Sequence, residues 1–570
     1  MTTNATASGQ AASPARTFTI DERKLRAITT DVLNRWPSAG VAAAVVYDGD
    51  LAWFHGHGLA DTGSNEPVTG DTVFRIGSVT KTFTAVAVMQ LWEQGMVDLD
   101  APVTRYLRAF RLVPARPDLR PVTLRHLLTH TAGIGYWPRI SDLLRPRRGS
   151  GVQSARPAVP LAEYLHHGLR VEVQPGTKWM YSNHGFATLG QVVEDVTGVP
   201  FDGYLREHVF DPLGMEHSDL TVSRKLRGRL ATGYVLRRRG LEPVPWHDVP
   251  TPGGGGICST TRDMVKYVAA LLNGERSGAG AILRPETIAS MFRSHFQPDP
   301  RIPGMGLAFD LSAEGGHRIV GKDGVVSGFL AQILLAPDDD IGVVVLCNTG
   351  GLDARGAPTP LAWAIMRHVL GLADNPFRTD VVAHPEVWAD LCGWYDLAPG
   401  PMTNVFIRLL MGAGAEVRVR DRQLLLQPLS PVPAMRRGMH LYHDDPNDPY
   451  VFRIDMSEMG KPPMPVVFTG GVEAKQPAER LCFGETVFHR RPDALNPRHL
   501  TTSALGAVAA AAAIRTALRR TTAPPRHNAS SDFERRLRLH RVGRVRRFAE
   551  HFDGAEAPPW PAVPGLGGST

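Results

Sequence analysis

Ser78 and Lys81 form the only Ser-x-x-Lys motif in the 570-residue chain. In a helix this spacing places a hydroxyl nucleophile one turn before an amine, on the same face. Only eight of the 63 basic residues are lysines, so arginine is the usual cation of this chain. A guanidinium keeps its proton near neutral pH, whereas a buried lysine can act as a base. The pair therefore predicts covalent acyl chemistry, with Ser78 as the nucleophile.

Two further motifs follow in order along the chain. They are Tyr181-Ser182-Asn183 and Lys322-Asp323-Gly324, and the second is followed directly by Val325. The phenol of Tyr181 can act as a base only if cations such as Lys81 and Lys322 lie close to it. Each motif alone is a weak signal, but the three together favour one shared site.

The motifs and their flanking residues resemble the serine β-lactamase and penicillin-binding-like hydrolases. The similar branch contains class C β-lactamases, D-stereospecific peptidases and related esterases, and the resemblance covers about residues 20 to 370. The flanking residues that carry it are Phe74-Arg75-Ile76-Gly77, Asp98-Leu99-Asp100-Ala101-Pro102-Val103, Leu127-Leu128-Thr129-His130-Thr131-Ala132-Gly133, Pro175-Gly176-Thr177 and Gly255-Gly256-Ile257-Cys258-Ser259-Thr260.

The resemblance implies a role for each motif residue. Ser78 would attack a carbonyl, Lys81 and Tyr181 would move protons, and Asn183 would orient Lys81 or a substrate amide. The backbone N–H groups of Ser78 and Val325 would form the oxyanion hole. Lys322, Asp323 and Gly324 would bind substrate. No metal or other cofactor is expected.

Asp323 departs from the pattern of the similar enzymes, which have Thr or Ser after the third-motif lysine. An acid there would repel a substrate carboxylate or tie up Lys322 as an ion pair. We therefore expect a small neutral or cationic ester or amide as substrate, and an esterase-like serine hydrolase. The alternatives are a D-aminopeptidase or weak β-lactamase and, in another class, a non-catalytic penicillin-type sensor, against which Tyr181 argues.

Several of these residues also have a structural interpretation. Ser78 could merely cap its helix, Tyr181 could be a core aromatic residue, and Lys322 could be a plain strand cation. His126 and His130 have the spacing of helical metal ligands, but no Glu follows His126, and we expect no metal site. The run of glycines 253 to 256 lacks the lysine of a phosphate-binding loop and predicts a close backbone approach beside the site.

The secondary-structure pattern predicts an α+β fold, an antiparallel sheet flanked by helices with a helical insertion, as in the β-lactamase and transpeptidase enzymes. Helices are expected at 21–35, at Thr80 to Glu93 and near 360–370, and a Thr260/Asp263 capping box should open another. The expected strands are 41–47, 51–59, 306–311, 317–320, 325–336 and 341–348.

We expect five segments: a disordered N-terminus (1–16), the hydrolase domain (17–372), a linker (373–386), a second domain (387–492), and an Ala-rich helix with a basic tail (493–570). In the second domain, the strand signals at 416–420, 423–427, 451–455, 466–469 and 480–489 predict a small β-barrel or sandwich. Its start, Leu391-Cys392-Gly393-Trp394-Tyr395, resembles the lipocalin-like barrel that follows some hydrolases of this branch.

Composition limits the remaining possibilities. Four cysteines without a C-x-x-C pair indicate neither a disulfide framework nor a zinc site, and residues 1–16 do not look like a secretory signal, so we expect a cytoplasmic protein. Residues 515–547 hold eleven arginines against two acids, which predicts at most a weak contact with an anionic surface and no specific nucleic-acid partner. The oligomeric state is left open.

Overall fold

The computed structural model describes residues 20–135, 160–272, 282–351, 355–378, 380–397, 411–412, 414–430, 432–472 and 476–497. The expected N-terminal segment, the Ala-rich helix near 502–518 and the basic tail lie outside the described residues. Among the described residues, no helix is long and apolar enough to cross a membrane.

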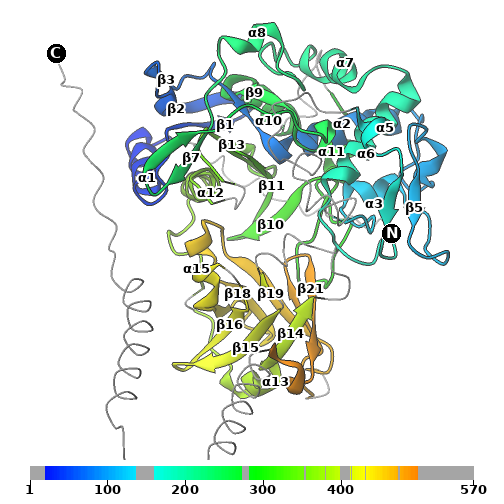
Figure 1. Ribbon diagram of the computed structural model, residues 1–570. Coiled ribbons are helices and arrows are strands. Elements are labelled where there is room, and N and C mark those ends of the chain that lie inside the picture. The colour runs from blue at the N-terminus through cyan, green and yellow to red at the C-terminus, as the bar shows by residue number, and fades with distance from the viewer. Residues whose placement is uncertain are drawn as a thin grey trace, which may run out of the picture. The chain divides into compact units, whose positions relative to one another are not determined.

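A seven-stranded antiparallel sheet forms the centre of the hydrolase region, in the order β10-β11-β12-β13-β1-β2-β3 (Figure 1). Strand β1 pairs with β13, with Val41 opposite Cys347, so the two ends of this region meet in the middle of the sheet. The α+β prediction with an insertion between early and late strands is confirmed. The strands are β1 (Gly40–Tyr47), β2 (Asp50–Asp61), β3 (Glu66–Pro67), β10 (Asp310–Glu314), β11 (His317–Val326), β12 (Phe329–Ala336) and β13 (Ile341–Cys347).

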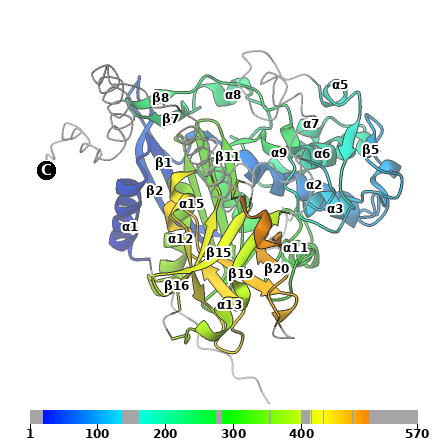
Figure 2. The same ribbon diagram turned by 60° about the horizontal axis from the view of Figure 1, so that its bottom comes forward.

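Helices cover both faces of this sheet. Figures 1 and 2 both place α1 and α12 on one side and the helices of the insertion on the other. The helices are α1 (Glu22–Arg35), α2 (Thr80–Glu93), α3 (Leu124–Leu128), α5 (Leu161–Tyr164), α6 (Asn183–Thr197), α7 (Phe201–Leu205), α8 (Arg224–Arg227), α9 (Pro252–Gly255), α10 (Thr261–Leu272), α11 (Pro285–Met291) and α12 (Pro358–Val369). Three two-stranded sheets join them: β4 (Val73–Arg75) with β9 (Cys258–Thr260), β5 (Leu112–Pro114) with β6 (Leu169–Val171), and β7 (Tyr234–Arg237) with β8 (Gly240–Pro243).

The alternation of side chains along β1 builds two cores. Val41 and Val45 pack with α1 and α12, whereas Ala42 and Val46 belong to the core that contains α2 and α10. Successive strand residues point to opposite faces, so an almost wholly apolar strand serves both layers. Helix α2 lies inside the second core and is buried from Thr80 through Leu91. A helix so enclosed holds the residues at its start in fixed positions.

Two expected strands, 325–336 and 306–311, differ in detail from the structure. The 325–336 run is broken at Ser327-Gly328, where Gly328 has φ +84° and turns the chain from β11 into β12. Strand β10 begins only at Asp310, because the amides of Gly306 and Leu307 donate to the carbonyls of Phe309 and Met291 instead of a neighbouring strand.

The predicted capping box at α10 is only half formed. The amide of Asp263 donates to Thr260 Oγ1 at 3.1 Å, as predicted. The Asp263 carboxylate, however, accepts hydrogen bonds from the amide of His217 and the hydroxyl of Ser218. The buried Asp263 therefore links α10 to the distant loop that contains His217 and Ser218, and its carboxylate does not cap the N-terminus of α10.

The second region is a closed barrel of eight antiparallel strands, which decides between the barrel and sandwich expected from the sequence. Pairing of Trp394 with Arg491 joins the first strand to the last. Its last two strands form a hairpin that turns at Gly484-Glu485, where the sequence predicted one continuous strand over 480–489. The strands are β14 (Gly393–Leu397), β15 (Ala415–Arg420), β16 (Gln423–Pro428), β17 (Met439–His443), β18 (Val451–Ile454), β19 (Met464–Thr469), β20 (Arg480–Phe483) and β21 (Thr486–Arg491); helices α13 (Trp388–Leu391) and α15 (Pro433–Arg436) accompany them.

Candidate active site

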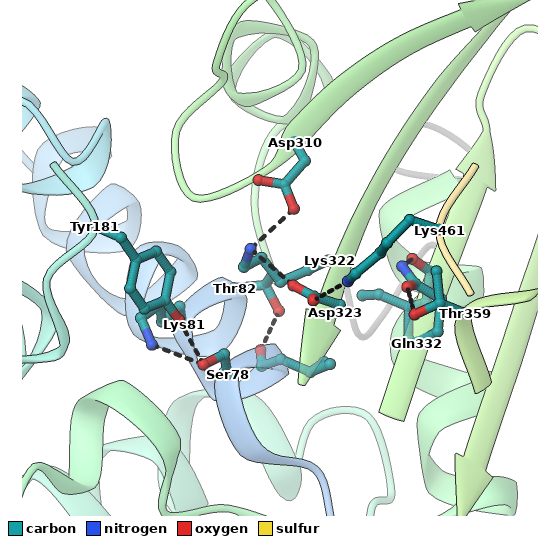
Figure 3. A network of polar contacts seen from close by, with 12 residues as sticks. Ser78, Lys81, Thr82, Tyr181, Asp310, Lys322, Asp323, Gln332, Thr359 and Lys461 are labelled. Carbon is teal, nitrogen blue, oxygen red and sulfur yellow. Dashed lines mark hydrogen bonds and ion pairs between the residues drawn. The ribbon is translucent and has the colours of Figure 1, made fainter. Parts of the chain in front are cut away.

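Ser78 lies in a short 3-10 turn, Gly77–Val79, directly before α2. The N-cap of α2 is Val79, and no side chain caps that end of the helix. The alternative interpretation of Ser78 as a helix cap is therefore wrong. Its half-buried hydroxyl points toward Lys81 and Tyr181 (Figure 3).

Two proton-carrying groups contact the Ser78 hydroxyl. Its Oγ lies 2.6 Å from the Tyr181 hydroxyl and 3.0 Å from Lys81 Nζ. Lys81 is fully buried, and its Nζ also donates to Asn183 Oδ1 at 2.7 Å and to the carbonyl of Gly254 at 2.6 Å. Both acceptors are neutral, so they orient the amine without adding a carboxylate that would favour its protonated form.

The start of α6 positions Tyr181 and Asn183. Ser182 is its N-cap, and its hydroxyl accepts from the amide of Gly185 at 3.1 Å. The ring of His130 packs 4.5 Å from that of Tyr181, and its Nδ1 accepts from the amide of Ser182. The Tyr181 ring is thus packed against His130, which is itself bonded to the start of α6.

The predicted close approach at the glycine run is confirmed. The first three of these glycines lie in α9, and a Cβ on Gly254 would lie 2.9 Å from the carbonyl oxygen of Asn183. A Cβ on Gly253 would lie 2.9 Å from the carbonyl oxygen of Phe186. Only glycine lets the backbone come near enough for Gly254 to accept from Lys81.

The third motif brings a second lysine to the site from β11. Lys322 is buried, with its Nζ 5.7 Å from the centre of the Tyr181 ring. Its Nζ donates to Asp310 Oδ2 at 2.8 Å and lies 3.4 Å from Asp323 Oδ1. The other carboxylate oxygen of Asp323 accepts from Lys461 Nζ at 3.0 Å. Figure 3 shows the Asp323 carboxylate between the two lysines.

Gly324 and Val325 pack against the turn that carries Ser78. A Cβ on Gly324 would lie 2.0 Å from the carbonyl oxygen of Ile76 and 3.2 Å from the backbone nitrogen of Ser78. Gly77 has φ +50°, and a Cβ there would lie 2.6 Å from the nitrogen of Val325. The backbones of these two segments are in contact, so the amides of Ser78 and Val325 lie close to each other. Their role as an oxyanion hole stays a prediction.

The two lysines have opposite electrostatic settings. Burial, and then the charge of Lys322, lower the pKa of Lys81 well below its ordinary value. Burial acts in the same direction on Lys322, but the carboxylates of Asp310 and Asp323 outweigh it and hold the pKa of Lys322 above its ordinary value. Lys81 is thus better suited than an ordinary lysine to accept a proton, and Lys322 to remain a cation.

Sequence reasoning missed three charged residues at this site. Asp310, at the start of β10, is the nearer partner of Lys322, although the motif suggested Asp323 for that role. Lys461 belongs to the barrel, and only the scarcity of lysine could have drawn attention to it. Glu485, in the turn between β20 and β21, interacts electrostatically with Asp310 and Lys322: burial and then the Asp310 carboxylate raise its pKa to about 7.

The histidines at 126 and 130 have structural partners. His126 and Thr123 form a capping box at the start of α3, in which His126 Nδ1 accepts from the amide of Thr123. His130 supports Tyr181 as described above. Their spacing reflects a helix start and a packed loop.

Comparisons with known proteins show which family the chain is similar to. The family model described as Beta-lactamase matches residues 30–365. The chain is 31% identical to the esterase EstB of Burkholderia gladioli over 323 residues, half of this chain and 78% of that protein. It is 30% identical to penicillin-binding protein 4 of Amycolatopsis lactamdurans over 61% of this chain and 88% of that protein. The solved structure of an octameric penicillin-binding protein homologue from Pyrococcus abyssi superimposes with a TM-score of 0.55 at 25% identity, covering 82% of this chain and all of that one.

Proposed function

Because the chain belongs to the beta-lactamase family, we propose that it is a serine hydrolase that cleaves a small ester or amide through a covalent acyl-enzyme. One observation carries the proposal: the Ser78 hydroxyl lies within hydrogen-bond distance of both the Lys81 amine and the Tyr181 phenol. A nucleophile in contact with two proton carriers has what acyl transfer requires.

In the first half of the reaction, Ser78 Oγ forms a bond to the substrate carbonyl carbon and gives its proton to neutral Lys81. The carbonyl oxygen becomes an oxyanion, which the amides of Ser78 and Val325 would stabilise. When the tetrahedral intermediate collapses, the bond to the leaving group breaks. The leaving oxygen or nitrogen takes a proton through Tyr181, and an acyl ester remains on Ser78.

In the second half, water takes the place of the leaving group. Tyr181 directs the water and relays its proton toward Lys81, and the hydroxide oxygen bonds to the acyl carbon. The bond to Ser78 Oγ then breaks, Ser78 recovers its proton, and the acid leaves. The network is restored, so the enzyme turns over repeatedly.

The charges around Lys322 support the expected substrate preference. Asp310 and Asp323 contact its ammonium, and Glu485 lies near it. A substrate carboxylate would have to displace or approach these acids, which disfavours penicillins and peptides ending in D-alanine. We therefore infer that the enzyme acts mainly as an esterase on neutral or cationic substrates.

A fluorophosphonate probe tests the nucleophile. It should label the native protein and fail to label the Ser78→Ala variant, whereas Ser64→Ala, a change of an exposed serine in the β2–β3 turn, should leave labelling intact. Labelling that survives Ser78→Ala would overturn the proposal.

A substrate panel tests the activity. p-Nitrophenyl esters should be hydrolysed over many turnovers, faster than D-aminoacyl anilides and nitrocefin. A single stoichiometric burst with no further turnover would instead support the acyl-ligand sensor. Faster cleavage of the anilides or of nitrocefin would support the D-aminopeptidase or β-lactamase alternative.

A further inference from the structure

The barrel contributes a charged side chain to the site in the hydrolase region. Lys461 follows the 3-10 turn Ser457–Met459 and lies 138 positions after Asp323 in the chain. Its ammonium lies 3.0 Å from Asp323 Oδ2, whereas Lys322 is 3.4 Å from Oδ1 of the same carboxylate. Asp323 is therefore held more closely by the barrel than by its neighbour on β11. Figure 3 shows Lys461 reaching Asp323 from the side opposite to Ser78 and Tyr181.

We propose that Lys461 is a positioning residue of the hydrolase site, which shares the Asp323 carboxylate with Lys322 and balances its charge. The inference rests on the proposed function and extends it to the barrel. It gives the barrel a part in catalysis that does not require any barrel atom to touch the reacting bond.

The argument follows from a charge count within the cluster. Lys322 and Lys461 carry two positive charges, and Asp310 and Asp323 carry two negative ones, so the four groups together are neutral. Removing the Lys461 charge leaves one excess negative charge, and Asp323 then has Lys322 as its remaining cation. Lys461 and Asp323 are only partly buried, with about 30% of each side chain exposed, but opposite charges this close still attract, so the carboxylate is expected to move closer to Lys322.

This change in charge alters the pKa of Lys81. Asp323 and Asp310 already act to raise the pKa of Lys81, against the larger effects of burial and Lys322. Without the Lys461 charge, the Asp323 carboxylate therefore raises the pKa of Lys81. More of the amine is then protonated, and the protonated form cannot accept the Ser78 proton. The limb on which activity rises with pH should move to higher pH.

Other titratable groups lie near Lys81 and Lys322, and they are the same residues in the native protein and in the Lys461 variants. They are Asp310 on β10, Tyr181 and His130 in the helical insertion, and Glu485 in the β20–β21 turn. Of these, Glu485 has its pKa raised to about 7 by burial and then by the Asp310 carboxylate. Its titration is common to the native protein and the variants, so the difference between their pH profiles isolates Lys461.

The experiment uses the full chain and compares Lys461→Met with Lys461→Arg and with the double variant Lys461→Met/Asp323→Asn. The single variant should lose about tenfold in kcat at pH values below the rising limb, with little change in KM, and that limb should move up by about one unit, because one pKa unit changes the fraction of neutral amine tenfold. Lys461→Arg keeps the charge and should stay near native. The control Arg437→Met removes an exposed barrel cation that pairs with Glu458, and it should match the native profile.

The double variant separates positioning from simple cohesion between the two regions. It restores the neutral charge count without restoring the ion pair, so it should recover most of the lost kcat and return the pH limb toward its native position. A double variant as impaired as Lys461→Met would show that Lys461 acts only as a link, and would overturn the proposal. An unshifted pH limb in Lys461→Met would overturn it as well.

An alternative variant and a second measurement distinguish failure of the Lys461 role from failure of the proposed hydrolase. If Lys461→Met does not fold, Lys461→Gln removes the same charge with a polar side chain and takes its place. The rate of fluorophosphonate labelling at Ser78 is measured in every variant. A native protein that is not labelled refutes the proposed hydrolase, whereas a labelled native protein with unchanged labelling of Lys461→Met at every pH refutes the role of Lys461 alone.

Discussion

Replacing Gly324 by Ala should inactivate the enzyme without unfolding it. The new Cβ would lie 2.0 Å from the carbonyl oxygen of Ile76, and real Cβ contacts are essentially never below 3.0 Å. The backbone of β11 or of the turn at Ser78 must therefore move by about 1 Å, a displacement that can cost about a hundredfold in rate. The backbone φ of Gly324 is not in the left-handed region, so the effect is steric and not conformational.

The expected size follows from the two amides that this contact brings together. Loss of one oxyanion donor lowers kcat by about 10² to 10³, or about 2.7 to 4 kcal/mol. Overpacking lowers the free energy of unfolding by about 1 to 3 kcal/mol, which most domains survive. We therefore expect kcat for p-nitrophenyl butyrate to fall by about 10² to 10³, with a smaller change in KM.

Steady-state kinetics and urea unfolding measure the two effects. The matched control is Gly228→Ala, where φ is −77° and no atom lies within 4 Å of the added Cβ. It should keep both activity and stability. A folded Gly324→Ala protein with native kcat would show that the backbone contact between β11 and the Ser78 turn does not set the geometry of catalysis.

Three more predictions test the chemistry and the boundary of the functional unit. Lys81→Arg should be nearly inactive toward esters despite keeping the charge, since a guanidinium is not a usable base; native-like kcat would make Lys81 only an electrostatic support. Activity should rise as the pH rises through the lowered pKa of Lys81. Lys322, whose pKa is raised, should cause no loss of activity below the ordinary lysine range. A kcat/KM profile that rises only near the ordinary lysine pKa of about 10.4 would contradict this. Asp323→Thr should raise the ratio of nitrocefin to p-nitrophenyl butyrate kcat/KM by about one to two decades, because a hydroxyl replaces an acid; an unchanged ratio would mean that Asp323 does not face the substrate.

The basic C-terminal segment gives a further prediction. Removing residues 498–570 should leave ester hydrolysis intact and abolish any binding to anionic vesicles, and that binding in the full chain should weaken steeply with added salt. Lost hydrolysis in a truncated protein with a native urea midpoint would place part of the functional unit beyond residue 497.

Local sequence patterns were sufficient for the elements that carry the motifs. The helix at Thr80–Glu93 and the β1–β2 hairpin follow from helix-forming residues, runs of β-forming residues and an Asp-Gly turn, all of which act over a few neighbours. The motif residues themselves could be singled out because a serine, a lysine and a tyrosine in this order suit few chemistries other than acyl transfer. The α+β class and the all-β character of the second region followed from the order of those patterns along the chain, whereas closure into a barrel was decided by the structure.

Other features were decided only by the tertiary structure. The breaks at Ser327-Gly328 and Gly484-Glu485 interrupt strands whose residues remain favourable for β structure, so local pattern could not find them. The partners of Lys322 and Asp323 are an acid on β10 and a lysine from the barrel, and no short-range signal marks either one. An ion pair depends on where two side chains end in space, and residues 138 positions apart are brought together by sheet pairing and barrel closure. The sequence by itself determined which groups can react, and only the folded chain determined the charges that surround them.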